Sequence, residues 1–312
     1  MKLNLRTLAV ALTAAAVAAS GMAQTKWDLA SAYPTTNFHT ENLLQFASDV
    51  EKATAGKLKI TVHANASLFK APEIKRSVQG GQTQAGEVLL VTFENENPLY
   101  GIDGIPFLAS SYADSKKLYD VSKKPLDAML GKQGMMLLYT VPWPPQGVYS
   151  KRRAYSPATA KLAELLGAQP VTVQAAELSQ ALSTGVIESY MSSGSTGYDT
   201  KTYESIKNWY DTQAWLPKNA VIINKKAFES LDKPTQTALL KVAKDAEIRG
   251  WKLSEEKNNW YKDQLKAKGM NIAVPSEQLV ADLRKAGNVM LAEWQRKAGD
   301  EGRAIIADYR TK

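Results

Sequence analysis

The sequence predicts an α/β protein of two lobes joined by a hinge. Strand-like and helix-like segments alternate over residues 26–93, which is typical of a lobe built around a parallel sheet. Three prolines at 142–145 then break the pattern, as a crossing between lobes would require. Residues 234–268 read as one helix, ~50 Å long at 1.5 Å per residue, which exceeds a single small lobe. We expect this helix to span both lobes.

The first 23 residues have the pattern of a secretory signal peptide. Lys2 and Arg6 precede the apolar run LAVALTAAAVAA, and small residues offer a cleavage site near Ala23. The apolar run, at roughly a dozen residues, is shorter than the about 20 that a membrane-spanning helix needs. The sequence therefore predicts an exported protein whose mature chain has no stable membrane insertion.

The first lobe is expected to comprise residues 24–145 and part of 215–312. Apolar residues alternate with polar ones in two segments, and a third is apolar throughout, as in a strand buried on both faces. The glycines that follow the helical patterns at 56 and 80 mark helix ends. The predicted elements are strands at 26–33, 57–65, 88–93 and 135–141 and helices at 39–56 and 71–80.

The second lobe is expected to comprise residues 146–214. It repeats the alternation of helix and strand, and the Gly-rich segment 194–199 reads as a turn. Two later strands return the chain to the first lobe, so the lobes are joined by two crossings. The elements predicted for this lobe are helices at 157–167 and 175–185 and strands at 171–174 and 186–193. The returning strands are predicted at 209–217 and 219–224, and a last helix is predicted at 275–299.

Composition excludes several kinds of site. The chain has no cysteine, and His39 and His63 are its only histidines, so Cys-ligated zinc and thiolate catalysis are excluded. The formal net charge of +8 falls to +6 without Lys2 and Arg6 and is spread along the chain, unlike the basic face of a nucleic-acid binder. We find no zinc-protease or serine-hydrolase motif and expect neither cofactor, metal nor catalysis.

A basic pair before a helix start is the first candidate for a binding site. Ser156 and Pro157 satisfy two criteria for a helix N-terminus, whose free N–H groups favour anions. Arg153 lies three residues before this cap, and its planar guanidinium matches a carboxylate through two hydrogen bonds. The alternative is an arginine pair that is simply solvated.

The other candidates surround the predicted crossing and the strand ends. Trp143 and Tyr149 offer aromatic walls and Gln146 an amide, although aromatic residues also fill cores and Gln146 suits solvent. Asn37 follows the first strand at the edge where α/β sheets bind ligands, but it equally suits a helix cap. Ser192, which ends a strand, and Trp215, in the returning segment, complete the set.

Four segments together resemble the solute-binding proteins of tripartite ATP-independent periplasmic (TRAP) transporters, in the four-carbon-dicarboxylate-type group. The segments are HTENLLQFASDVEKATAGKLKI, IPFL, RAYSPATAKLAELLGAQPVTVQAAELSQALSTGVIES and AWLPKNAVIINKKAFESL. The resemblance implies a periplasmic binding protein fold, with a hinge and a long helix spanning both lobes. It also implies capture of an organic acid and its delivery to a membrane permease.

The resemblance also implies roles for individual residues. Arg153 occupies the position of the arginine that grips the ligand carboxylate, and Gln146 that of a second arginine found in sugar-acid binders. One fixed positive charge favours a monocarboxylate. The nearby aromatic residues lead us to expect a 2-oxo or 2-hydroxy acid, and an acid with an aromatic body is one form of this expectation. The chain is shorter than the family pattern at 151–153. A carboxylate-dependent exported enzyme and a relic with a deletion in the second lobe are the alternatives.

Overall fold

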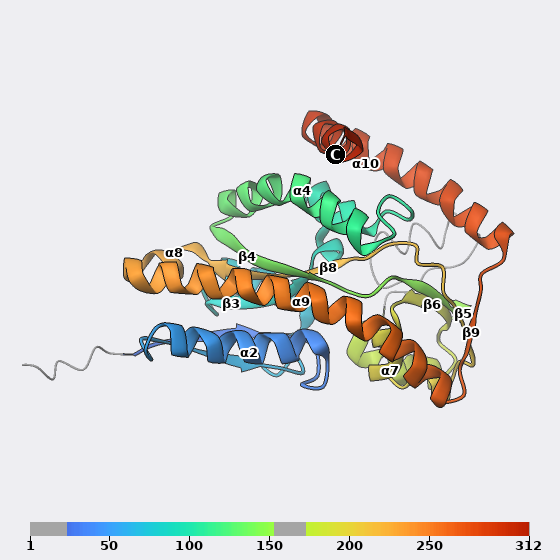
Figure 1. Ribbon diagram of the computed structural model, residues 1–312, viewed down its shortest axis with the longest axis horizontal. Coiled ribbons are helices and arrows are strands. Elements are labelled where there is room, and N and C mark those ends of the chain that lie inside the picture. Colours follow the sequence, from blue (N-terminus) through green and yellow to red (C-terminus); the bar gives the residue numbers. More distant parts are fainter. Residues whose placement is uncertain (1–23, 153–172, 312) are drawn as a thin grey trace, which may run out of the picture.

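The computed structural model describes residues 24–152 and 173–311 and contains two sheets. The predicted signal peptide, Arg153 and the helix predicted at 157–167 lie outside the described residues. Within the two described ranges, every helix is too short or too polar to span a bilayer. The order of the elements and the arrangement of the layers are shown in Figure 1.

The first sheet contains five strands, which are β1 (Thr25–Ala30), β2 (Leu58–His63), β3 (Ala85–Leu89), β4 (Met135–Pro142) and β8 (Lys218–Asn224). Their order in the sheet is β2-β1-β3-β8-β4. β1 pairs in parallel with β2 and β3, whereas β8 runs antiparallel between β3 and β4. The proline-terminated strand β4 thus lies at an edge, where the missing N–H of Pro142 interrupts no further ladder.

The segment 88–93, predicted as one strand, is a strand only at its beginning. β3 ends at Leu89, and Leu90–Phe93 form a short 3-10 helix, η1. Leu90, Val91 and Phe93 are nevertheless buried. A short apolar run indicates burial but does not distinguish a strand from a helical turn, which is why the prediction was wrong here.

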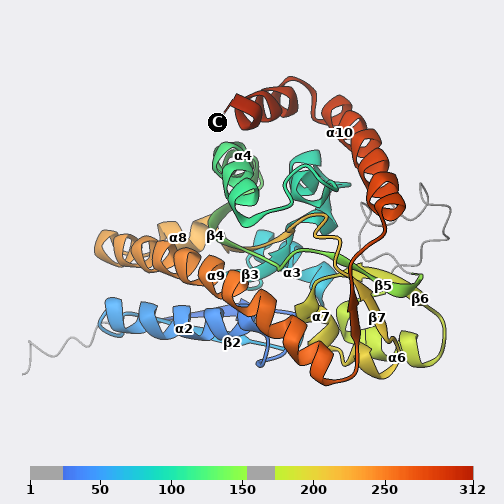
Figure 2. The ribbon, with the colours of Figure 1, turned by 45° about the vertical axis from the view of Figure 1, so that its right-hand side comes forward.

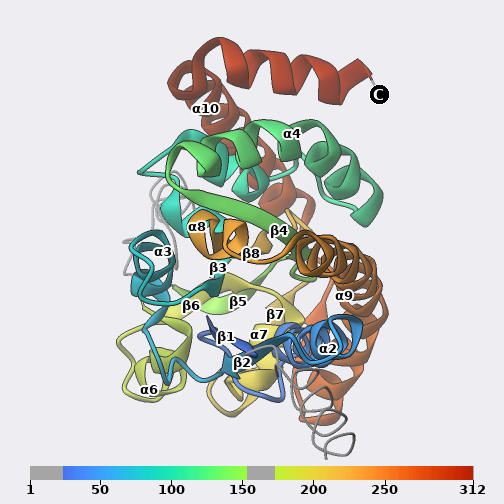
Figure 3. The same ribbon diagram turned by 90° about the vertical axis from the view of Figure 1, so that its left-hand side faces the viewer.

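The first sheet separates two hydrophobic cores. Along β8, Ala220 and Ile222 point into one core, while Val221 and Ile223 point into the other. This alternation follows from the period of two in a strand, and it explains why both sets of side chains are apolar. Helices α2 and α9 close one core, whereas α3 and α4 close the other, as Figure 3 shows. These helices are α2 (Phe38–Ala53), α3 (Ala71–Gln79), α4 (Tyr112–Lys132) and α9 (Lys233–Ala267).

The second sheet contains four strands, which are β5 (Gly147–Arg152), β6 (Glu188–Ser192), β7 (Asn208–Tyr210) and β9 (Asn271–Ala273). Their order is β6-β5-β7-β9. A third core lies against this sheet, in which the ring of Tyr149 stacks on Tyr190 at 4.5 Å and on Trp209 at 5.4 Å. Tyr149, considered above as a wall of the ligand site, is therefore a core residue with no exposed surface.

Four local predictions in this part of the chain differ from the structure. The segment 194–199, expected to be a turn, is helix α7 (Gly194–Asp199), which Ser193 caps by accepting from the N–H of Thr196. The strand expected at 209–217 ends at Tyr210. Val173 and Gln174 do not belong to a strand, and the following helix is reduced to α6 (Leu178–Ser183), preceded by a short 3-10 turn. Glycines and serines in short segments support helix caps as well as turns, so the local signal is ambiguous.

The segments that connect the two sheets run side by side. The chain leaves β4 through residues 143–146 and returns to β8 through 211–217. Gln146 N donates to Trp215 O at 2.9 Å, and Ala214 N donates to Gln146 O at 3.0 Å. Trp143 N also donates to Pro217 O at 2.8 Å. Paired backbone segments of this kind form the hinge that the prolines predict.

Helix α9 contacts both sheets. It packs on α2 and β4 at one end and on α7 and β9 at the other, as Figure 1 shows. At Gly250 the backbone approaches so closely that an added Cβ would lie 2.3 Å from Val141 Cγ2. The absence of a side chain at Gly250 therefore allows the long helix to pack closely on the first sheet.

The last helix, α10 (Glu277–Thr311), packs on α4 and on the 3-10 segment η2 (Pro98–Gly104), and Figure 2 shows it lying beside α4. It bends at Gly299, where φ is 63° and ψ is −145°, a conformation that glycine adopts without a Cβ penalty. Gly299 is not helical, so the helix predicted at 275–299 ends here and a second helical segment follows within α10. Its apolar side chains complete the core that α3 and α4 close.

Candidate ligand-binding site

A cavity of about 760 Å³ lies between the two sheets, beside the hinge segments. Its wall combines apolar and aromatic side chains with a few polar groups, as small-molecule sites usually do. Of the lining residues that the structure describes, Lys70 is the basic one, and it is exposed. The first sheet and its loops contribute Tyr33, Glu87, Val88, Leu89, Thr92, Phe93 and Trp143, and the second part of the chain contributes Gln146, Val173, Gln174, Glu177, Ser192 and Thr196.

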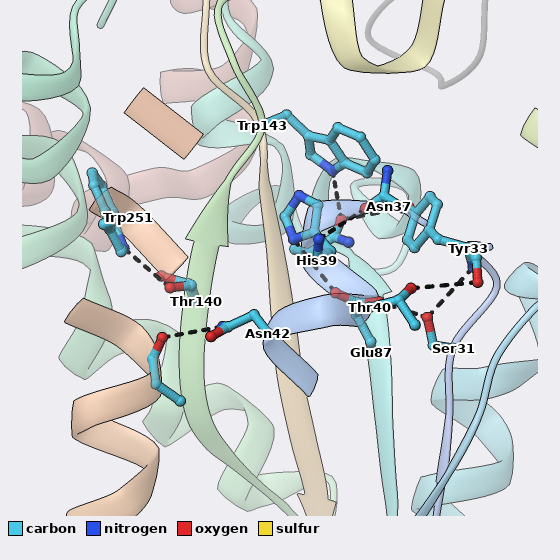
Figure 4. Close-up of polar contacts among 12 residues, drawn as sticks. Ser31, Tyr33, Asn37, His39, Thr40, Asn42, Glu87, Thr140, Trp143 and Trp251 are labelled. Carbon is cyan, nitrogen blue, oxygen red and sulfur yellow. Dashed lines mark hydrogen bonds and ion pairs between the residues drawn. The ribbon is translucent and has the colours of Figure 1, made fainter. Parts of the chain in front are cut away.

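Trp143 forms an aromatic wall of this cavity. Its Nε1 donates to Asn219 Oδ1 at 2.8 Å, and its ring lies 4.3 Å from the ring of His39 and 5.0 Å from that of Tyr33, centroid to centroid. Figure 4 shows these side chains gathered around the indole. Because the hydrogen bond and the ring contacts fix its orientation, Trp143 presents a rigid face to the cavity.

Gln146 lines the cavity from the hinge itself. Its backbone pairs with the returning segment, as described above, and its Nε2 donates to Pro144 O at 2.9 Å. The side chain is almost fully buried, with 1% of its surface exposed. The amide is therefore held in place by the hinge rather than extended into solvent.

Ser192 and Thr196 line the opposite side. Ser192 is the last residue of β6, where it pairs with Gly147 of β5, and Thr196 lies in the first turn of α7. Both come from the second sheet and its following helix. The cavity is thus bounded by both sheets, as a closing clamp requires.

Two of the predicted site residues do not line this cavity. Asn37 caps α2, its Oδ1 accepting from His39 N at 2.9 Å, and its Nδ2 donates to Asp199 Oδ2 at 2.7 Å. Trp215 is buried in the core that α3 and α4 close, and its Nε1 has no hydrogen-bond partner among the described residues. Its carbonyl accepts from Gln146 N, so it contacts the site through the hinge backbone.

Sequence reasoning missed Glu87, a carboxyl group buried in the cavity wall. Its Oε2 accepts from Ser31 Oγ at 2.7 Å, and its Oε1 lies 3.5 Å from His39 Nδ1 (Figure 4). Burial, only partly offset by the side chains of Ser31 and Asn219, raises the pKa of Glu87 to about 7. Burial also holds the pKa of His39 well below its ordinary value, so the contact joins a neutral imidazole to a carboxyl group.

A signal for Glu87 was present in the sequence. It is an acidic residue inside the apolar run AGEVLLV, and a carboxyl group in a buried strand is costly unless something compensates for it. The residues predicted to bind the ligand lie at strand ends and in the crossing. Tyr33, at the end of the strand predicted at 26–33, also lines the cavity but was not among them. Glu177 lines the cavity as well. In the described parts of the chain, no three carboxylate or imidazole groups lie close enough to hold a metal ion.

The chain is similar to known solute receptors. It matches the family described as bacterial extracellular solute-binding protein, family 7, over residues 29–143 and 151–297. It is 59% identical to DctP6, a Bordetella pertussis extracytoplasmic solute receptor binding pyroglutamic acid; the TM-score is 0.91, with 92% of this chain and 100% of that chain covered. It is 44% identical to a marine metagenome TRAP solute binding protein specific for pyroglutamate, with a TM-score of 0.90 and coverage of 93% and 99%.

A more distant relative is an uncharacterized protein of Haemophilus influenzae, 26% identical over 219 residues, which are 62% of this chain and 64% of that protein. Together with the two sheets and the hinge, the similarity to the solved receptors confirms the two-lobed α/β fold. The chain therefore belongs to family 7 of the bacterial extracellular solute-binding proteins and is a TRAP solute-binding protein, from a family whose members bind small organic acids in the periplasm and work with a membrane permease.

Proposed function

We propose that this protein captures pyroglutamate and delivers it to its TRAP permease. The observation that carries the proposal is the 59% identity to a pyroglutamate receptor over almost the whole described chain. The second pyroglutamate-specific relative, 44% identical, supports the same ligand independently. Pyroglutamate is a monocarboxylate, as expected from the sequence, but its body is a five-membered lactam rather than a 2-oxo or 2-hydroxy acid.

The cavity suits a small cyclic acid. The flat ring can lie against Trp143, which its hydrogen bond to Asn219 holds in place. Gln146 and Ser192 place polar groups on the facing side. An apolar wall opposed by a few fixed polar groups gives orientation as well as affinity.

The ligand carboxylate needs a cationic partner, for which we propose Arg153. Among the described residues that line the cavity, only the exposed Lys70 carries a positive charge. A ligand carboxylate that loses its water without gaining a cationic partner is costly. Asn37 and Trp215 are proposed to act indirectly, Asn37 through Asp199 and Trp215 through the hinge backbone.

We also propose a division of the chain into lobes. The first lobe comprises residues 24–145 and part of 215–312, the second comprises 146–214, shortened at 151–153, and the spine helix at 234–268 supports both. Residues 1–23 direct export and are removed near Ala23. N-terminal sequencing of the protein purified from a periplasmic fraction tests the cleavage site.

Calorimetry on the mature protein tests the ligand. Pyroglutamate, proline, glutamate, 2-oxoglutarate and an aromatic acid are titrated in parallel, and thermal unfolding is recorded with each. A ligand at 100 times its Kd stabilises the native state by ~2.7 kcal/mol. We expect the largest shift with pyroglutamate. Tighter binding of any of the other acids, or no shift with pyroglutamate, would contradict the proposal, and turnover of a bound acid would favour the exported enzyme.

A further inference from the structure

The carboxyl group of Glu87 lies in the cavity wall among neutral groups. Ser31, the residue after β1, donates to it, and His39 of α2 lies 3.5 Å away. Asn219 of β8 and Tyr139 of β4 also lie close to it. Both ring nitrogens of His39 and the hydroxyl of Tyr139 lack hydrogen-bond partners among the described residues. None of the four neighbours is a cation at neutral pH, since burial keeps the pKa of His39 low. The hydrogen bonds from Ser31 and Asn219 favour the ionised form of Glu87, but they do not outweigh the cost of its burial.

A protonated carboxyl group has a hydrogen-bonding pattern that an ionised one lacks. It presents one O–H donor beside one carbonyl acceptor, whereas the carboxylate offers acceptors alone. The edge of a lactam ring presents an N–H donor beside a C=O acceptor, because the ring forces the amide to be cis. The two patterns are complementary, and pairing them satisfies both groups with two parallel hydrogen bonds.

We propose that Glu87, in its neutral form, recognises the lactam edge of the ligand and so selects pyroglutamate over rings that lack this edge. The inference rests on the proposed function and names the residue that sets its specificity. A neutral Glu87 also avoids placing a second negative charge beside the ligand carboxylate. An ionised Glu87 would accept from the ring N–H but would oppose the lone pairs of the lactam carbonyl.

The pairing makes binding depend on pH. With the pKa of Glu87 raised to about 7, the unliganded site loses its proton above neutrality. The ligand carboxyl group stays ionised throughout, and His39 stays neutral, so Glu87 is the group in this cluster that titrates. The affinity for pyroglutamate should then fall by about tenfold for each pH unit above 7, because binding requires uptake of one proton.

The experiment measures the Kd of pyroglutamate and of cyclopentanecarboxylate by calorimetry between pH 6 and pH 9. Cyclopentanecarboxylate has the same ring size and carboxylate but no lactam edge. Glu87→Gln keeps a donor beside an acceptor without a titrating proton, and Glu87→Met removes both at a similar size. Thermal unfolding confirms that each variant folds. Because Glu94 and Asp199 also have pKa values raised to about 7 and about 6, the comparison with Glu87→Gln isolates the contribution of Glu87.

We expect Glu87→Gln to bind pyroglutamate within about fivefold of the native protein at pH 6, with little change up to pH 9. Glu87→Met should weaken pyroglutamate by about thirtyfold or more and cyclopentanecarboxylate by less than about threefold. Equal losses for the two ligands, or a native affinity that does not change between pH 6 and 9, would overturn the role of Glu87. If Glu87→Met fails to fold, the pH profiles of the native protein and Glu87→Gln still decide. Failure of the native protein to bind pyroglutamate at any pH would instead refute the proposed function, and the lactam pairing with it.

Discussion

The side chains of Asn37 and Asp199 join the start of α2 to the last residue of α7, through a hydrogen bond of 2.7 Å from Nδ2 to Oδ2. Asn37 also caps α2, which packs on the first sheet. The same residue therefore starts a helix of one lobe and binds α7, which follows strand β6 of the second sheet. Ser195 Oγ lies 3.5 Å from the same carboxylate oxygen. Burial, partly offset by Asn37 and Ser195, raises the pKa of Asp199 to about 6.

This pKa predicts how stability depends on pH. The ordinary pKa of aspartate lies near 3.8, so the native state holds the proton more tightly than the unfolded chain does. The stability contributed by Asp199 is therefore complete below about pH 4 and is lost as the pH rises through 6. In Asp199→Asn the side-chain oxygen still accepts from Asn37, but nothing titrates. Relative to this variant, the native protein should lose roughly 2 kcal/mol of unfolding free energy between pH 4 and pH 7.5.

Thermal unfolding followed by circular dichroism at four pH values measures this difference. The control is Asp263→Asn, which changes a largely exposed carboxylate on α9. Its difference from the native protein should vary much less with pH. A difference between the native protein and Asp199→Asn that is constant from pH 4 to pH 7.5 would show that Asp199 titrates alike in the folded and unfolded states.

Gly250 should be intolerant of a side chain. In Gly250→Ala the new methyl group would lie 2.3 Å from Val141 Cγ2 and 2.9 Å from Asn42 Nδ2, so α9 must move away from β4 and α2. We expect a loss of about 1–3 kcal/mol, which outweighs the gain in helix propensity. Denaturant titration gives the unfolding free energy.

Gly131 provides the matched control. It lies in α4, and apart from the neighbouring backbone of that helix no atom of the described residues lies within 4 Å of the position that its Cβ would occupy. Gly131→Ala should therefore stabilise the protein by about 0.5–1 kcal/mol through helix propensity alone. Similar effects of the two substitutions would mean that the contact at Gly250 relaxes without cost.

The two buried tryptophans near the hinge should differ in their effect on binding. Trp143→Phe removes the donor that Asn219 Oδ1 accepts and changes the wall of the cavity, so we expect ligand affinity to fall by about tenfold. Trp215→Phe removes an Nε1 with no hydrogen-bond partner among the described residues, in a core position away from the cavity. It should alter stability while leaving affinity within about threefold. Calorimetry with pyroglutamate measures both, and a larger loss of affinity in Trp215→Phe would place the site elsewhere.

Arg153 should be essential for binding the ligand carboxylate. We expect Arg153→Ala to abolish measurable binding and Arg153→Lys to bind at least about tenfold more weakly, since lysine cannot form two parallel hydrogen bonds with a carboxylate. Both variants should unfold at nearly the temperature of the unliganded native protein. Arg152→Ala removes the same charge one position earlier and should retain binding. If Arg152→Ala and Arg153→Ala both bind pyroglutamate as tightly as the native protein does, neither arginine holds the ligand.

Local patterns identified most of the elements but not every boundary. The helix after Asn37 and the strands at 57–65 and 135–141 follow from caps and from periodicity, both of which act within a few residues. The turn expected at 194–199 is a helix because Ser193 caps it and α9 packs against it. The strand expected at 209–217 ends early because its second half pairs with the hinge segment instead.

The sequence by itself determined the α/β class, the family and the importance of the proline-rich crossing, because these depend on composition, short-range order and motif succession. It also predicted Trp143, Gln146 and Ser192 as site residues, and these three line the cavity. Only the tertiary structure revealed that Glu87, His39 and Asn219 meet beside Trp143, because these residues come from three elements that the sheet order brings together. A pKa near 7 for a glutamate, and with it the proposed recognition of a lactam, depends on burial, which no local pattern specifies.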